Sequence, residues 1–101
     1  MKQHQLTAVI FDKRGKVLSI GQNSYLKTHP EQAKWANKVG RADAIYLHAE
    51  IAAIIRCPDI SRAHSILVTR YGKNGLPGLA APCSICASAI AATPIKLIRH
   101  T

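Results

Sequence analysis

The sequence predicts a single α/β domain built on a mixed sheet. Segments rich in β-branched residues alternate along the chain with Ala- and Ile-rich segments of helical spacing. A length of 101 residues suits one small domain, and a hydrophobic content of 48% is enough to build its core. No internal repeat or low-complexity segment divides the chain, so residues 1–101 are expected to fold as one domain.

The first half of the chain predicts a β-hairpin followed by an irregular segment. Residues 6–11 are apolar and partly β-branched, residues 12–15 have the composition of a turn, and residues 16–21 read as the returning strand. Residues 23–41 are polar, and we expect one short helix among them, at about residues 31–37.

The second half predicts two helices and two strands. Residues 44–56 carry apolar side chains at helical spacing, and Pro58 ends this helix. A strand at 65–70 and a Gly- and Pro-containing loop at 71–81 follow. A helix at 83–92 and a strand at 95–99 complete a β-β-α-β-α-β order, which predicts parallel pairing of the last two strands with the sheet.

The charge balance favours an anionic partner. Fourteen Lys and Arg residues stand against five Asp and Glu, a net charge of +9. Such an excess attracts nucleotides and nucleic acids, although a charged surface that only maintains solubility has the same composition. The cations are scattered along the chain, so the sequence contains no nucleic-acid-binding tail and leaves nucleic acid open as a partner.

Cysteine usage and hydropathy favour a cytoplasmic protein, or one of the host cytoplasm if a phage encodes it. No apolar run is long enough to span a bilayer, no charged-then-apolar leader begins the chain, and no membrane partner is expected. The number of Cys residues is three, and two of them form a C-x-x-C pair. That pattern favours a metal in a reducing compartment over a disulfide framework.

Two motifs carry the chemistry, His48-Ala49-Glu50 and the later Pro82-Cys83-Ser84-Ile85-Cys86. One His and two Cys occupy three positions of a tetrahedral zinc site and leave the fourth for water. Cys83 and Cys86 are three residues apart, so a helix places both sulfur atoms on one face. Glu50 is not needed as a ligand and is suited to carry protons to and from that water.

Other interpretations account for only part of this pattern. The Pro-Cys-x-x-Cys motif alone fits a redox dithiol, but that hypothesis leaves His48 and Glu50 unexplained. A zinc ribbon needs a second C-x-x-C, which the chain lacks. A zinc ion with only a structural role needs no uncoordinated carboxylate beside it.

Together the two motifs resemble those of the cytidine deaminase superfamily, in which H-x-E precedes P-C-x-x-C. Residues 47–54 are similar to the deoxycytidylate deaminase version, and free cytidine deaminases typically carry Cys in place of His48. The resemblance implies a three-layer α/β/α fold with a mixed sheet of four to five strands, here without the N-terminal helix. It implies zinc held by His48, Cys83 and Cys86, with Glu50 as the catalytic residue.

The same resemblance suggests residues that contact the substrate. Asn23, in Gly21-Gln22-Asn23, matches the family's sugar-binding Asn. The other candidates are Ala49, Ala81, His29 and Tyr71. His29 lies in the loop that lines the mouth of the pocket in this family, and Tyr71 is placed to cover a base. Ala81 departs from the family pattern, because Ser, Thr or Glu commonly precedes the Pro; its backbone carbonyl remains available.

The sequence therefore predicts a zinc-dependent hydrolytic deaminase. We expect it to convert a cytosine nucleotide or nucleoside, such as dCMP or cytidine, to the uracil form with release of ammonia. An enzyme that edits a C or A base in single-stranded DNA, RNA or tRNA is one alternative, and a non-catalytic zinc-binding module is a second. We also expect a homo-oligomer, because the few predicted helices cover little of the sheet.

Overall fold

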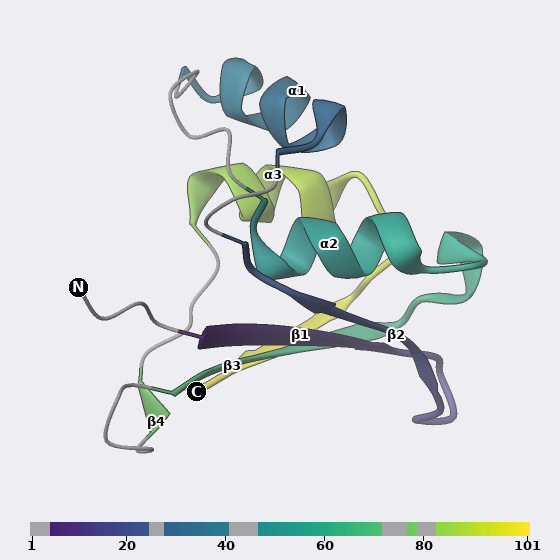
Figure 1. The fold of residues 1–101 in the computed structure, drawn as a ribbon. Coiled ribbons are helices and arrows are strands. Elements are labelled where there is room, and N and C mark those ends of the chain that lie inside the picture. The colour runs from purple at the N-terminus through teal and green to yellow at the C-terminus, as the bar shows by residue number, and fades with distance from the viewer. Residues whose placement is uncertain (1–4, 25–27, 41–46, 72–76, 79–82) are drawn as a thin grey trace.

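A computed structural model describes residues 5–24, 28–40, 47–71, 77–78 and 83–101 (Figure 1). The elements follow in this order: β1 (Gln5–Phe11), β2 (Val17–Gln22), α1 (Pro30–Lys38), α2 (Ala49–Arg56), the short 3-10 helix η1 (Ile60–Arg62), β3 (Ser65–Tyr71), β4 (Pro77–Gly78), α3 (Ser84–Ala91) and β5 (Leu97–His100).

The strands form one mixed five-stranded sheet, as an α/β domain of this class requires. β1 lies between β2 and β3 and pairs antiparallel with both. β5 pairs in parallel with β3, and the two-residue β4 pairs antiparallel with the far end of β3. The α/β class and the mixed sheet are confirmed.

The expected parallel pairing is found between the last two long strands, β3 and β5, whereas β3 pairs antiparallel with β1. The connection through α2 does make β3 run in the same direction as β2. However, β1 lies between β2 and β3. The strand that hydrogen-bonds to β3 on that edge is therefore β1, which is antiparallel to it.

Two element boundaries also differ from the sequence prediction. The helix expected from residue 44 begins at Ala49, because His48 has extended backbone angles (φ −86°, ψ 154°) that precede the helix. The loop expected at 71–81 contains β4, whose Pro77 pairs with the last residue of β3. Pro at the first position of such a short edge strand leaves no sheet hydrogen bond unmade.

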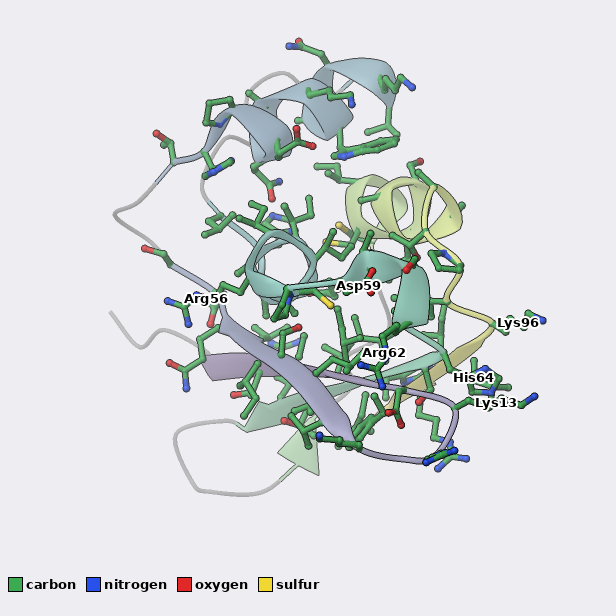
Figure 2. The ribbon with its side chains drawn as sticks, turned by 90° about the vertical axis from the view of Figure 1, so that its right-hand side faces the viewer. Lys13, Arg56, Asp59, Arg62, His64 and Lys96 are labelled. Atoms are coloured by element: carbon green, nitrogen blue, oxygen red, sulfur yellow. The ribbon has the colours of Figure 1, made fainter. Side chains whose placement is uncertain are left out.

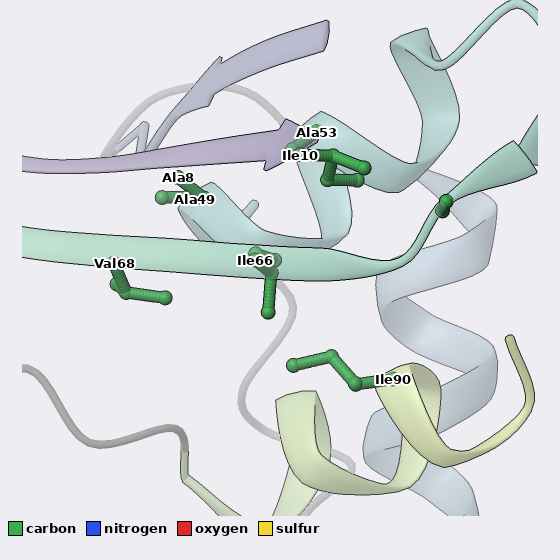
Figure 3. Packing of buried hydrophobic residues seen from close by; sticks show 8 residues of the cluster. Ala8, Ile10, Ala49, Ala53, Ile66, Val68 and Ile90 are labelled. Atoms are coloured by element: carbon green, nitrogen blue, oxygen red, sulfur yellow. The ribbon is translucent and has the colours of Figure 1, made fainter. Parts of the chain in front are cut away.

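The three described α-helices lie on the same side of the sheet (Figure 1). Alternate residues of β1 and β3 point toward them, so Ala8, Ile10, Ile66 and Val68 have no exposed surface. Figure 3 shows these side chains packed with Ala49 and Ala53 of α2 and Ile90 of α3. The second helical layer that the resemblance implies is not contributed by the described residues.

β2 approaches α2 so closely that residue 21 must be glycine. A Cβ atom at Gly21 would lie 2.6 Å from the Ala49 carbonyl oxygen and 2.8 Å from the carbonyl carbon of Ala52, and would also clash with the amide nitrogen of Ala53. On the same strand, the Ser19 hydroxyl donates a 2.8 Å hydrogen bond to the Ala53 carbonyl. This contact sets the position of α2 above the sheet.

The opposite face of the sheet carries exposed apolar side chains. Val9 pairs with Ile20 on one side and Leu67 on the other, and all three project away from the helices. Ile20 is 50% exposed and Leu97, on the edge strand, 46%. In the part of the chain that the structure describes, no helix is long and apolar enough to cross a membrane.

Candidate metal centre

The first turns of α2 and α3 come together, and each begins at a predicted metal ligand. His48 is the N-cap of α2 and Cys83 is the N-cap of α3. Helices usually begin at Ser, Thr, Asp or Asn, whose side chains bond to the free amides of the first turn. Neither His48 nor Cys83 makes such a side-chain bond. Their side chains are directed toward each other instead.

The three predicted ligands form a compact cluster. His48 Nδ1 lies 3.3 Å from Cys86 Sγ and 3.5 Å from Cys83 Sγ. All three ligand atoms lie within 4.8 Å of one another. Tetrahedral zinc with Zn–N of about 2.05 Å and Zn–S of about 2.3 Å requires an N···S separation of about 3.6 Å. The His/Cys/Cys set therefore has the donors and the spacing to hold a zinc ion.

The cysteine spacing follows from the helix geometry of α3. Cys83 is the N-cap, so Cys86 is the third residue of the first turn. A side chain at the N-cap reaches naturally toward that third residue, as it does in capping boxes. Cys86 is fully buried and Cys83 is partly exposed, so the cluster is closed on the Cys86 side.

The two thiols differ in acidity because they share a proton. The hydrogen bond from Cys86 and the nearby His48 lower the pKa of Cys83 to about 3. That same hydrogen bond, together with burial, raises the pKa of Cys86. The lowered pKa of Cys83 favours its thiolate form, and thiolate is the form that ligates zinc.

Glu50 lies beside this cluster in the first turn of α2. It is only 4% exposed. Burial raises its pKa, while hydrogen bonding to Cys86 and the neighbouring His48 oppose the rise. A buried carboxyl group with a raised pKa holds a proton more readily than an exposed one, which suits a group that takes up and releases protons.

Gln32 is a residue of the site that the sequence did not indicate. It lies on α1, is fully buried, and its carboxamide oxygen accepts a 3.1 Å hydrogen bond from the His48 N–H. This bond satisfies one of the free amides at the start of α2 and ties α1 to the metal ligand. A polar residue within a short helix gives no sequence signal for this role.

Asn23 and His29 both take part in local backbone structure. The Asn23 carboxamide oxygen accepts a 2.9 Å hydrogen bond from the Leu6 N–H, which joins the end of β2 to the start of β1. The His29 Nδ1 atom accepts from the Glu31 N–H at 3.1 Å and caps α1. A sugar-binding role for Asn23 and a base or phosphate contact by His29 stay predictions.

The remaining substrate candidates are only partly placed. Ala49 is 1% exposed, and it packs in the core between α2 and the sheet. Tyr71 ends β3 with its backbone paired to Pro77. The Tyr71 side chain and Ala81 lie outside the described residues.

Residues 1–99 match a family model described as the cytidine and deoxycytidylate deaminase zinc-binding region. The match includes the His48 and Cys83 motifs and every described helix. No curated protein matches the chain.

Proposed function

Because the chain belongs to the family of the cytidine and deoxycytidylate deaminase zinc-binding region, we propose that it is a zinc-dependent hydrolytic deaminase of a cytosine nucleotide or nucleoside. The product is the uracil form, and ammonia is released. One observation carries this proposal: the three ligand atoms lie within 4.8 Å of one another, with the buried Glu50 carboxyl beside them.

The residues of the site have different roles in this proposed reaction. Zinc, when held by His48, Cys83 and Cys86, would lower the pKa of a water and so supply a nucleophile at neutral pH. The positive ends of the α2 and α3 dipoles stabilise the thiolate ligands. The hydrogen bond that the His48 N–H donates to the Gln32 carboxamide oxygen keeps the backbone of His48 in position.

Glu50 carries the protons of the reaction. Its carboxylate oxygen accepts a proton from the attacking water and delivers it to the ring nitrogen of the base. The second proton from that water passes through the same oxygen to the exocyclic amine. The carbon–nitrogen bond then breaks, ammonia leaves, and a carbonyl takes its place. Burial of Glu50 keeps bulk water from competing for these protons.

Further features of the proposed function concern the substrate, the compartment and the assembly. Asn23 would contact the sugar of the substrate. The second candidate function is a deaminase that edits a C or A base within single-stranded DNA, RNA or tRNA, and the net charge of +9 favours it. A reducing compartment such as the cytoplasm would keep Cys83 and Cys86 able to bind zinc. A homo-oligomer would cover the exposed Ile20 and Leu97 side chains.

Ammonia release from a panel of cytosine and adenine nucleosides, nucleotides and oligonucleotides tests the proposal directly. Elemental analysis should find one zinc per chain, and Cys83→Ala with Cys86→Ala should abolish it. We expect Glu50→Gln to keep zinc and fold but to lose turnover by far more than tenfold, since an amide cannot shuttle protons.

Glu31→Gln is the matched control for that variant, because Glu31 also lies in the first turn of a helix but is exposed. It should turn over like wild type. Activity of Glu50→Gln within about tenfold of wild type, or about 1.4 kcal/mol, would exclude Glu50 as the proton carrier.

A further inference from the structure

Cationic side chains gather at the end of the sheet opposite the metal centre. They come from the turn after β1, from η1 and from the segment before β5, and we call this set the basic loop end: Lys13, Arg14, Lys16, Arg62 and Lys96. All five are exposed. Three of them lie within four residues of the sequence, and the fold brings Arg62 and Lys96 close to these three.

Backbone hydrogen bonds hold these loops side by side. The His64 N–H donates to the Phe11 carbonyl at 2.8 Å, and the Lys96 N–H donates to the His64 carbonyl at 2.9 Å. The turn that follows Phe11 and the segment that carries Lys96 therefore flank residue 64. Figure 2 shows Lys13, His64 and Lys96 at one edge of the molecule, with Arg62 next to them.

The carboxylates at this end are engaged by their own loops. Asp12 is only 7% exposed. It accepts the Arg14 and Lys16 N–H groups at 2.9 Å each and pairs with Arg62 at 3.7 Å. Asp59 accepts the Ser61 N–H at 3.2 Å. Within the described ranges, the Arg62–Asp12 contact is the one ion pair that the structure records.

The basic loop end is separate from the candidate metal centre. α2 and α3 begin at the metal ligands and run toward this end, and each has eight residues. Eight residues of helix rise about 12 Å. These cations therefore do not contact a base held at the metal centre. Clustered like charges also destabilise the folded chain, and an anionic partner offsets that repulsion.

We propose that the basic loop end binds the phosphate backbone of a nucleic acid. A row of Lys and Arg matches the regularly spaced charges of that polymer, and phosphate contacts need no aromatic or base-reading group. None of the five residues is aromatic, so the binding is expected to be independent of sequence. The proposal goes beyond the deaminase function, because the binding requires neither zinc nor turnover.

Fluorescence anisotropy with a labelled single-stranded DNA 20-mer tests this surface. The double variant Lys13→Gln with Lys96→Gln is compared with Lys34→Gln with Lys38→Gln, which removes the same charge from the exposed face of α1. Binding is measured from 50 to 300 mM salt. Each phosphate contact that is lost should reduce the slope of log K against log salt by about 0.7.

The Lys13/Lys96 variant should bind at least about tenfold more weakly than wild type at 50 mM salt, with a slope smaller by about 1.4. The affinity of the Lys34/Lys38 control variant should fall much less. The variant Lys13→Arg with Lys96→Arg, which keeps both charges, should bind like wild type. Equal losses in both pairs would assign the binding to net charge and overturn the proposal. It would also be overturned by no binding, or by preferential binding to phosphatidylserine vesicles.

These results are independent of the deaminase assay. Hydrolysis of a free nucleotide, if present, should be unchanged in the Lys13/Lys96 variant, because its two side chains lie away from the metal centre. Failure of the deaminase proposal would appear as absent ammonia release with binding intact. Failure of this inference would appear as absent binding, or as equal losses of affinity in the Lys13/Lys96 and Lys34/Lys38 variants, with turnover intact.

Discussion

Replacing Gly21 with Ala adds one methyl group where β2 packs closely against α2. That methyl carbon would lie 2.6 Å from the Ala49 carbonyl oxygen and 2.8 Å from the Ala52 carbonyl carbon. An unstrained van der Waals contact between such atoms needs a separation of about 3.5 Å, so β2 and α2 must move apart by about 1 Å. The obstructing atoms belong to helix backbone and cannot rotate away.

The cost of this separation has two parts. Overpacking of this kind costs about 1–3 kcal/mol. The 2.8 Å bond from the Ser19 hydroxyl to the Ala53 carbonyl would also weaken, for about 1 kcal/mol more. A total of about 2–4 kcal/mol corresponds to a fall in Tm of about 10–30 °C for a domain of this size.

Thermal and urea unfolding followed by circular dichroism measure this cost, and zinc content per folded chain reports whether His48 has moved with α2. Gly15→Ala is the control: Gly15 has φ of +85° but no atom within 4 Å of an added Cβ. It should cost only the conformational penalty, about 1 kcal/mol. If Gly21→Ala costs no more than Gly15→Ala, the contact between β2 and α2 is not rigid and the reasoning is wrong.

Three further predictions follow from the described residues. Gln32→Leu leaves the His48 N–H without its acceptor, so we expect a loss of about 1–3 kcal/mol in unfolding free energy and faster zinc transfer to a chelator; unchanged zinc retention would show that Gln32 does not position His48. Hydrogen bonds from the Lys16 and Arg14 amides and the charge of Arg62 lower the pKa of Asp12 from 3.8, so its contribution to stability is present above about pH 4 and is lost as the pH falls through its folded value. The free energy of unfolding of Asp12→Asn should therefore fall below that of wild type by more at pH 7 than at a pH below about 4, and an equal deficit at both pH values would contradict this account. Static light scattering should give a multiple of 11.0 kDa for the wild-type chain and a lower mass for Ile20→Asp, whereas a wild-type mass near 11.0 kDa would refute the homo-oligomer.

The chemistry of the metal centre could be predicted from the sequence because it depends on local spacing and residue type. Cys83 and Cys86 share a helix face whatever surrounds them, and a His-x-Glu motif at a helix start places a ligand and a carboxyl close together. Most strands and helices were predicted for the same reason, since apolar periodicity reports which face of an element is buried.

Periodicity does not report which element lies next to which. Because β1 lies between β2 and β3, β3 pairs antiparallel with β1, whereas the crossover through α2 alone predicted a parallel pair. Gln32 supports His48 only because α1 folds over the start of α2, and Gly21 is required only because β2 packs against that helix. These contacts join segments distant in the chain, so no local signal encodes them.

The basic loop end shows the same division between sequence and structure. Its cations lie in three separate stretches of the sequence, and the sequence alone indicated only a net charge of +9. Hydrogen bonds between Phe11, His64 and Lys96 bring the three loops together at one end of the sheet. The sequence thus determined the candidate ligands and the sign of the charge, while the tertiary structure decided where that charge is concentrated, because long-range pairing sets the distances between loops.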